Sequence, residues 1–74
     1  MGIKEFIEKF AEANEIEVVD QITPETEFRT LDGWSSLSVM ITIAFFDEEC
    51  GKEISGADIK NATTIQDLFN LATA

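Results

Sequence analysis

The chain has 74 residues, of which 45% are hydrophobic, so we expect one folded domain spanning residues 1–74. Fifteen acidic against five basic residues give a formal net charge of −10, which argues against nucleic-acid binding because no basic stripe is present to neutralise phosphates. One cysteine and no histidine exclude an internal disulfide, a Cys/His zinc site and any catalytic triad with an imidazole base. We therefore expect neither a metal site nor an independent hydrolase.

The N-terminal segment has the spacing of an amphipathic helix that ends near Asn14. Glu5 and Lys9 are placed for an ion pair one turn apart. The segment lacks the apolar core of a secretory signal, and no apolar run approaches the ~20 residues of a membrane span, so we expect a cytoplasmic protein. The apolar stripe of this helix consists of Ile3, Phe6, Ile7 and Phe10.

The segment between Asn14 and Ser35 is a long connection without a helical period. Its Thr-Pro-Glu-Thr run at 23–26 predicts a turn, or one helical turn that starts at Pro24. A short strand at Glu15–Val19 is an alternative, although no partner strand is evident. Because long connections in small domains are usually packed or functional, we expect apolar side chains to hold it to the core. These are Ile16, Val18, Val19, Ile22, Phe28 and Leu31.

Ser35 is placed to cap a second helix that runs to about Cys50, with Gly51 just after its end. One row of this helix is predicted to be buried and comprises Met40, Ile43, Phe46 and Cys50. A second row, Leu37, Ile41 and Phe45, lies on another side of the helix. Two interpretations of the second row stay open: packing in the core, or an exposed docking patch beside Ser36.

Three acidic residues, Asp47, Glu48 and Glu49, crowd the last turn of this predicted helix. Acids at this end oppose the helix dipole at a cost of about 0.3–1 kcal/mol each. Three in a row favour attraction to basic protein partners over a merely solvated end.

The C-terminal third predicts a short helical turn near Gly56–Asn61 and a last helix that starts with Thr63 and Gln66 as a capping box. The predicted fold is all-α, a small four-helix bundle of three main helices and one short helix, and we expect a monomer.

Ser36 is the most informative residue, because it lies where the turn-rich segment meets the apolar helix. In the first turn of a helix, unpaired N–H groups and the positive end of the dipole favour a nearby anion. No base is evident to activate the hydroxyl, so the position suits a covalently attached phosphate-linked group better than an enzyme nucleophile.

Three runs stand in a characteristic order along nearly the whole chain: Leu31-Asp32-Gly33-Trp34-Ser35-Ser36-Leu37, Gly51-Lys52-Glu53-Ile54 and Thr63-Thr64-Ile65-x-Asp67-Leu68. In these runs the chain resembles the acyl carrier protein family, whose Asp-Ser-Leu signature carries 4′-phosphopantetheine on the serine. The resemblance implies covalent 4′-phosphopantetheine attachment at Ser36, with Ser35 in the aspartate position. Ser38 and Ile41 stand where the family commonly has acidic residues, which implies a more apolar docking surface and a carrier for a dedicated pathway.

The resemblance implies a carrier rather than an enzyme. It would hold acyl or aminoacyl intermediates as thioesters for fatty acid, specialised lipid or polyketide-like biosynthesis, after a phosphopantetheinyl transferase has attached the arm from coenzyme A. Further partners would be acyl-transferring, synthase or ligase enzymes with basic or apolar patches. The predicted partner-binding residues are Leu37, Ile41, Phe45, Asp47 and Glu48. The alternative is an unmodified adaptor that binds through Leu37, Ile41 and Phe45.

Carriers of this family can also shelter the acyl chain between their helices. Core packing alone would explain most of the residues that are candidates for lining such a cleft: Met40, Ile43, Ile54, Ile59, Ala62 and Leu68. Trp34 either contacts the arm or a partner, or closes the loop onto the bundle. Cys50 is expected to fill a core position as a small apolar residue.

Overall fold

The computed structural model describes residues 1–74 and contains four α-helices and no strand. The helices are α1 (Ile3–Ala13), α2 (Ser36–Phe45), α3 (Gly56–Asn61) and α4 (Ile65–Thr73). Three short helical turns complete the fold, two of 3₁₀ type, η1 (Val19–Gln21) and η2 (Phe28–Thr30), and one π-helical turn, η3 (Phe46–Cys50). The all-α prediction is confirmed, and the alternative of a strand at Glu15–Val19 is wrong. None of the helices combines the length and the apolar character needed to cross a bilayer.

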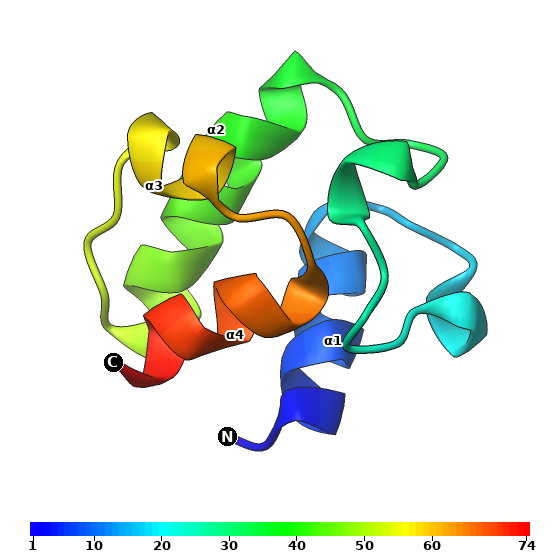
Figure 1. Ribbon diagram of the computed structural model, residues 1–74, viewed down its shortest axis with the longest axis horizontal. Coiled ribbons are helices and arrows are strands. Elements are labelled where there is room, and N and C mark those ends of the chain that lie inside the picture. The colour runs from blue at the N-terminus through cyan, green and yellow to red at the C-terminus, as the bar shows by residue number, and fades with distance from the viewer.

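The start of α2 lies at the end of the molecule opposite both chain termini (Figure 1). From there α2 runs back along the molecule and contacts α1 on one side and α3 on another. The helix α4 packs against α1 near the termini. The first residue of α2, Ser36, therefore projects at a free end of the fold.

Aromatic rings fill the core between α1, α2 and α4. The Phe6 ring meets the rings of Phe45, Phe46 and Phe69 edge-on, at centroid distances of 5.5, 5.9 and 5.5 Å. Each fully buried ring contributes about 1.5–3 kcal/mol through its removal from water, and the edge-on geometry adds to that. The predicted apolar stripe of α1 is confirmed by Phe6, Ile7 and Phe10, which are buried, and by Ile3, which packs partly buried against the core.

Asn14 ends α1, as predicted. Its buried side-chain amide donates hydrogen bonds from Nδ2 to the Phe10 carbonyl oxygen (3.2 Å) and to Thr42 Oγ1 of α2 (3.4 Å). The next residue, Glu15, has φ 56°, which turns the chain out of the helix. The amide thus links the end of α1 to the middle of α2.

The long connection packs against the core as expected, with one exception. Val18 is exposed because the chain bends away from the core just before η1, whereas the other five predicted anchors are buried or partly buried. Arg29 of η2 fixes the connection to α3, since its Nη2 donates to the carbonyl oxygens of Ile59 (2.7 Å) and Lys60 (2.6 Å). These carbonyls belong to the last turn of α3, where a helix end leaves carbonyl oxygens short of N–H donors; the Ile59 carbonyl also accepts from the Ala62 N–H at 3.1 Å.

The predicted turn at 23–26 is confirmed, since the Thr26 N–H donates to the Thr23 carbonyl at 3.0 Å. This turn also receives the start of α4. The N–H groups of Ile65 and Gln66 donate to the carbonyls of Thr26 (3.0 Å) and Pro24 (2.9 Å). The connection therefore supplies acceptors for N–H groups that a helix start leaves unpaired.

The helical path of α2 continues to Cys50, as predicted, but its last five residues form the wider π turn η3. Gly51 then adopts φ 63°, and the N–H groups of Gly51 and Lys52 both donate to the Phe46 carbonyl oxygen. A left-handed residue after a helix is the usual way to satisfy its last carbonyls, and glycine adopts it without steric cost.

The short helix α3 is confirmed with its predicted bounds. The cap of α4 was predicted one residue too early, because Thr64 and Asp67 form the capping box rather than Thr63 and Gln66. The Asp67 carboxylate accepts from the N–H groups of Thr63 (2.9 Å) and Thr64 (3.0 Å), and Thr64 Oγ1 accepts from the Asp67 N–H (3.2 Å). A single carboxylate oxygen, Asp67 Oδ2, thus accepts from both N–H groups at the start of α4.

Candidate functional site

The loop that leads to Ser36 is attached to the core by Trp34. The indole stacks on Phe10 (centroids 6.1 Å apart, 26° between the planes) and meets Phe28 edge-on (5.0 Å, 66°). Gly33 has φ 95°, a left-handed conformation that an L-residue rarely adopts. Of the two roles proposed for Trp34, closing the loop onto the bundle is therefore the one that its contacts support.

The start of α2 is organised by Ser35 and Ser38. Ser35 has an extended backbone, its N–H donates to Ser38 Oγ (3.0 Å), and its carbonyl accepts from the Ser38 N–H (2.9 Å). Ser35 is the N-cap, as predicted. Ser38 is buried, and its hydroxyl accepts the hydrogen bond from the Ser35 N–H, so this position contributes nothing to the exposed surface of α2.

Ser36 is the first residue of α2 and is exposed to solvent. The N–H groups of Ser36 and Leu37 have no acceptor within the protein. They point outward at the positive end of the helix dipole, beside the Ser36 hydroxyl. An anionic group attached to this hydroxyl would meet two unpaired donors and a favourable field.

Large apolar side chains surround Ser36 on α2. Leu37 is 61% exposed and Met40 is 68% exposed, while Ile41 is partly exposed. The prediction that Met40 is buried is wrong. The inward face of α2 is taken by Ser38, Thr42 and Phe45, at i, i+4 and i+7, and this rotation turns Met40 to solvent.

The predicted docking role of Phe45 is also wrong, because this side chain is only 4% exposed. Its ring packs edge-on against Phe6 (5.5 Å) and Phe10 (6.3 Å), which makes it part of the core. The acidic pair Asp47 and Glu48 is exposed, as a docking surface requires.

An open groove of about 450 Å³ lies between α2 and the segment that precedes α3. Three of the predicted cleft residues, Met40, Ile43 and Ile54, line it together with Ala44, Asp47 and Glu53. The other three, Ile59, Ala62 and Leu68, are buried in the core. Half of the predicted cleft set thus lines a surface groove, and half packs the interior.

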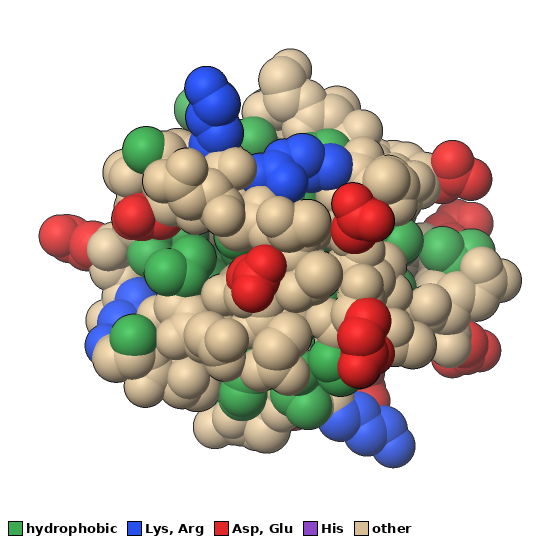
Figure 2. Space-filling view, in the orientation of Figure 1, with side chains coloured by type: hydrophobic (Ala, Val, Ile, Leu, Met, Phe, Trp, Pro, Cys, Tyr) green, Lys and Arg blue, Asp and Glu red, His purple; other side chains and the backbone are tan.

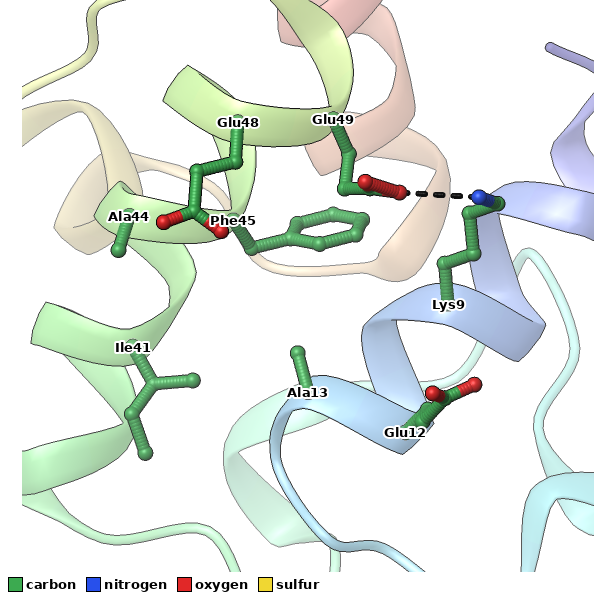
Figure 3. A pocket seen from close by; sticks show the side chains of 8 residues that line it. All are labelled: Lys9, Glu12, Ala13, Ile41, Ala44, Phe45, Glu48 and Glu49. Carbon is green, nitrogen blue, oxygen red and sulfur yellow. Dashed lines mark hydrogen bonds and ion pairs between the residues drawn. The ribbon is translucent and has the colours of Figure 1, made fainter.

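A second groove, of about 420 Å³, lies between α1 and α2 (Figure 3). An ion pair from Lys9 Nζ to Glu49 Oε1 (2.9 Å) spans one end of it, with the two side chains 40% and 37% exposed. The hydrogen bond and the negative charge of Glu49 raise the pKa of Lys9 above its ordinary value of 10.5. The predicted Glu5–Lys9 pair is absent because Lys9 reaches across to Glu49 instead. The lining residues are Lys9, Glu12, Ala13, Ile41, Ala44, Phe45, Glu48 and Glu49.

Cys50 is partly buried at the end of η3 and packs against the core, near its expected role. Burial raises the pKa of its thiol above the ordinary value of 9.0, and the negative charge of Glu49 raises this pKa further. The thiol therefore stays protonated, which makes it a poor nucleophile at neutral pH.

Acidic side chains are spread over the surface, with apolar atoms between them, as one face shows in Figure 2. No group of three or more Cys, Asp or Glu side chains lies close enough together to hold a metal ion. No family model matches the chain, and no curated protein is significantly similar to it.

Proposed function

We propose that the chain is a carrier protein of the acyl carrier type. In this proposal Ser36 holds 4′-phosphopantetheine through a phosphodiester, and the protein presents acyl or aminoacyl groups to separate enzymes of fatty acid, specialised lipid or polyketide-like biosynthesis. The observation that carries the proposal is the position of Ser36, exposed on the first residue of α2 beside two unpaired N–H groups.

The residues around Ser36 fit the phosphopantetheine group. The N–H groups of Ser36 and Leu37 are free to donate to its phosphate, and the exposed side chains of Leu37 and Met40 offer apolar contact to its arm. When bound, the group supplies a thiol that carries the acyl chain as a thioester. The free end of the fold leaves space around the hydroxyl, and the Trp34 contacts hold the preceding loop in place.

The chain itself is not proposed to catalyse a reaction. Ser36 has no histidine in the whole chain to accept its proton, so a phosphopantetheinyl transferase would have to supply the base and the coenzyme A. Enzymes that use the carrier would dock on α2, where exposed Leu37 and partly exposed Ile41 provide apolar area and exposed Asp47 and Glu48 attract basic patches.

The test is the intact mass of the purified chain after incubation with coenzyme A and a broad-specificity phosphopantetheinyl transferase. We expect a gain of one phosphopantetheine in the wild type and in Ser35→Ala, and no gain in Ser36→Ala. Ser35 is the matched control because it is also an exposed serine and lies one residue away. Absence of the gain in the wild type, with a known carrier modified in the same reaction, would contradict the proposal. So would a gain that persists in Ser36→Ala.

The exposure of Leu37 and Met40 also favours a second candidate, an unmodified adaptor that binds partner proteins through α2. This adaptor would lack Phe45 from its docking surface, because Phe45 is buried. Partner binding that survives Ser36→Ala and is lost in Ile41→Asp would favour the adaptor over the carrier.

A further inference from the structure

The α1–α2 groove lies on the side of α2 that faces α1, whereas the groove with Met40 and Ile54 lies on the side toward α3. Ala44 lines both grooves, so its exposed methyl marks the ridge between them. In Figure 3 the side chains of Ala13 and Ile41 face each other across the open space, and Phe45 extends from α2 between the helices. The α1–α2 groove thus has apolar walls and an aromatic floor.

The rim of this groove is acidic and only partly neutralised. Glu49 is paired with Lys9, but Glu12 and Glu48 are exposed and have no basic partner in the protein. Two carboxylates that form no ion pair therefore stand beside an apolar depression, one on α1 and one on η3.

We propose that this groove binds a segment of a partner protein that carries one aliphatic side chain flanked by arginine or lysine. The aliphatic side chain would lie between Ala13 and Ile41, and the flanking cations would pair with Glu12 and Glu48. The small side chains of Ala13 and Ala44 leave the space open, and no larger residue closes it. The identification of the partner as an enzyme that uses the carrier rests on the proposed function. The groove itself requires no arm on Ser36.

Charge complementarity selects this occupant. With a net charge of −10, a second copy of the chain would be repelled, and so would an anionic membrane surface. A basic segment is attracted over long range and then gains apolar contact at the groove. The site extends docking to α1, through Glu12 and Ala13, beyond the residues of α2 that the sequence indicated.

The first experiment titrates the ¹⁵N-labelled, unmodified chain with a short capped peptide that has one leucine flanked by arginines in an alanine background. We expect the largest amide shifts at Ala13, Ile41 and Ala44, and loss of binding when the leucine becomes alanine or the arginines become glutamates. Shifts concentrated at Met40 and Ile54, or no binding up to the solubility of the peptide, would overturn the proposal.

The second experiment compares two variants of equal net charge. Glu12→Gln with Glu48→Gln removes the unpaired groove carboxylates, whereas Glu17→Gln with Glu25→Gln removes two exposed carboxylates elsewhere. We expect affinity to fall about tenfold in the first variant and less than about twofold in the second. Equal losses of affinity in the two variants would show that the peptide is attracted by the overall charge of the chain, and would overturn the proposal that it binds in the α1–α2 groove.

The Ser36 mass assay on the wild type separates this inference from the carrier proposal. If the chain gains phosphopantetheine but fails the peptide tests, only the proposal of a docking groove is contradicted. If the chain binds the peptide at the groove but gains no mass, only the carrier proposal is contradicted.

Discussion

The indole of Trp34 stacks on the ring of Phe10, with the centroids 6.1 Å apart, and so ties the loop before Ser36 to α1. Trp34 also meets Phe28 of η2, so one side chain joins the loop before Ser36 to both α1 and η2. Since Ser36 follows two residues later, the contacts of Trp34 set where α2 begins relative to the core.

We therefore predict that Trp34→Ala lowers the free energy of unfolding by about 2–4 kcal/mol, and that Trp34→Phe costs less because a ring is kept. Urea denaturation followed by far-ultraviolet circular dichroism measures both changes. Val18→Ala is the control, because Val18 is an exposed apolar residue of the same connection and should change stability by less than about 0.5 kcal/mol. A Trp34→Ala midpoint equal to that of the control would show that the stacking does not anchor the loop.

Phe45 and Leu37 belong to the same predicted row of α2, but the structure separates their roles. Phe45→Ala should lower the free energy of unfolding by about 3–5 kcal/mol, because its ring is buried among Phe6 and Phe10. Leu37→Ala should leave stability within about 0.5 kcal/mol, because the side chain is 61% exposed. Thermal unfolding of the two variants checks this contrast. Similar losses in both would mean that Leu37 packs in solution.

Periodicity predicted the helices well because each main helix buries a stripe that can be read along the chain, as Phe6, Ile7 and Phe10 do in α1. It failed on α2, where apolar residues occupy nearly the whole circumference. The buried face there is marked by the polar residues Ser38 and Thr42, whose hydroxyls bond to Ser35 and Asn14. Hydropathy alone could not indicate that a serine and a threonine would point inward.

In the candidate site, too, some features could be predicted from local sequence and others depend on how the helices pack. The exposed position of Ser36 at a helix start followed from local signals, namely the turn residues before it and the apolar run after it. The Lys9–Glu49 pair joins residues 40 positions apart, so it depends on how α1 packs against η3. No local pattern indicates that contact, and for the same reason the α1–α2 groove was not predicted.

Asp67 should make the stability of the fold sensitive to acid. Hydrogen bonds from the N–H groups of Thr63 and Thr64 hold the pKa of Asp67 below its ordinary value of 3.8. A depressed pKa in the folded state adds stability that is present above the unfolded value and is lost as pH falls through the folded value. We predict that stability falls less steeply below about pH 4 in Asp67→Asn than in the wild type.

Urea midpoints measured between neutral pH and acid test this prediction. Glu17→Gln is the control, because the exposed Glu17 carboxylate accepts no hydrogen bond in the fold and its loss should leave the acid slope nearly unchanged. Parallel curves for the wild type and Asp67→Asn would contradict the role assigned to the cap of α4.

Two glycines should respond to alanine in opposite directions. Gly51 has φ 63°, and a Cβ there would meet no atom within 4 Å, so the cost of Gly51→Ala is one of backbone conformation alone, about 1–2 kcal/mol. Gly56 opens α3, and its Cβ would meet Val39 at an ordinary 3.9 Å. Gly56→Ala should therefore add about 0.4–1 kcal/mol by restricting the unfolded chain.

Gly51→Asn sharpens the comparison, because asparagine tolerates the left-handed conformation better than alanine and should recover part of the loss. Denaturant midpoints of the three variants give the order Gly56→Ala, wild type, Gly51→Asn, Gly51→Ala, from most to least stable. If Gly51→Ala matched the wild type, the turn after η3 would have to adopt another conformation. The acidic end of α2 would then present Asp47 and Glu48 differently, because both lie within the π turn that Gly51 terminates.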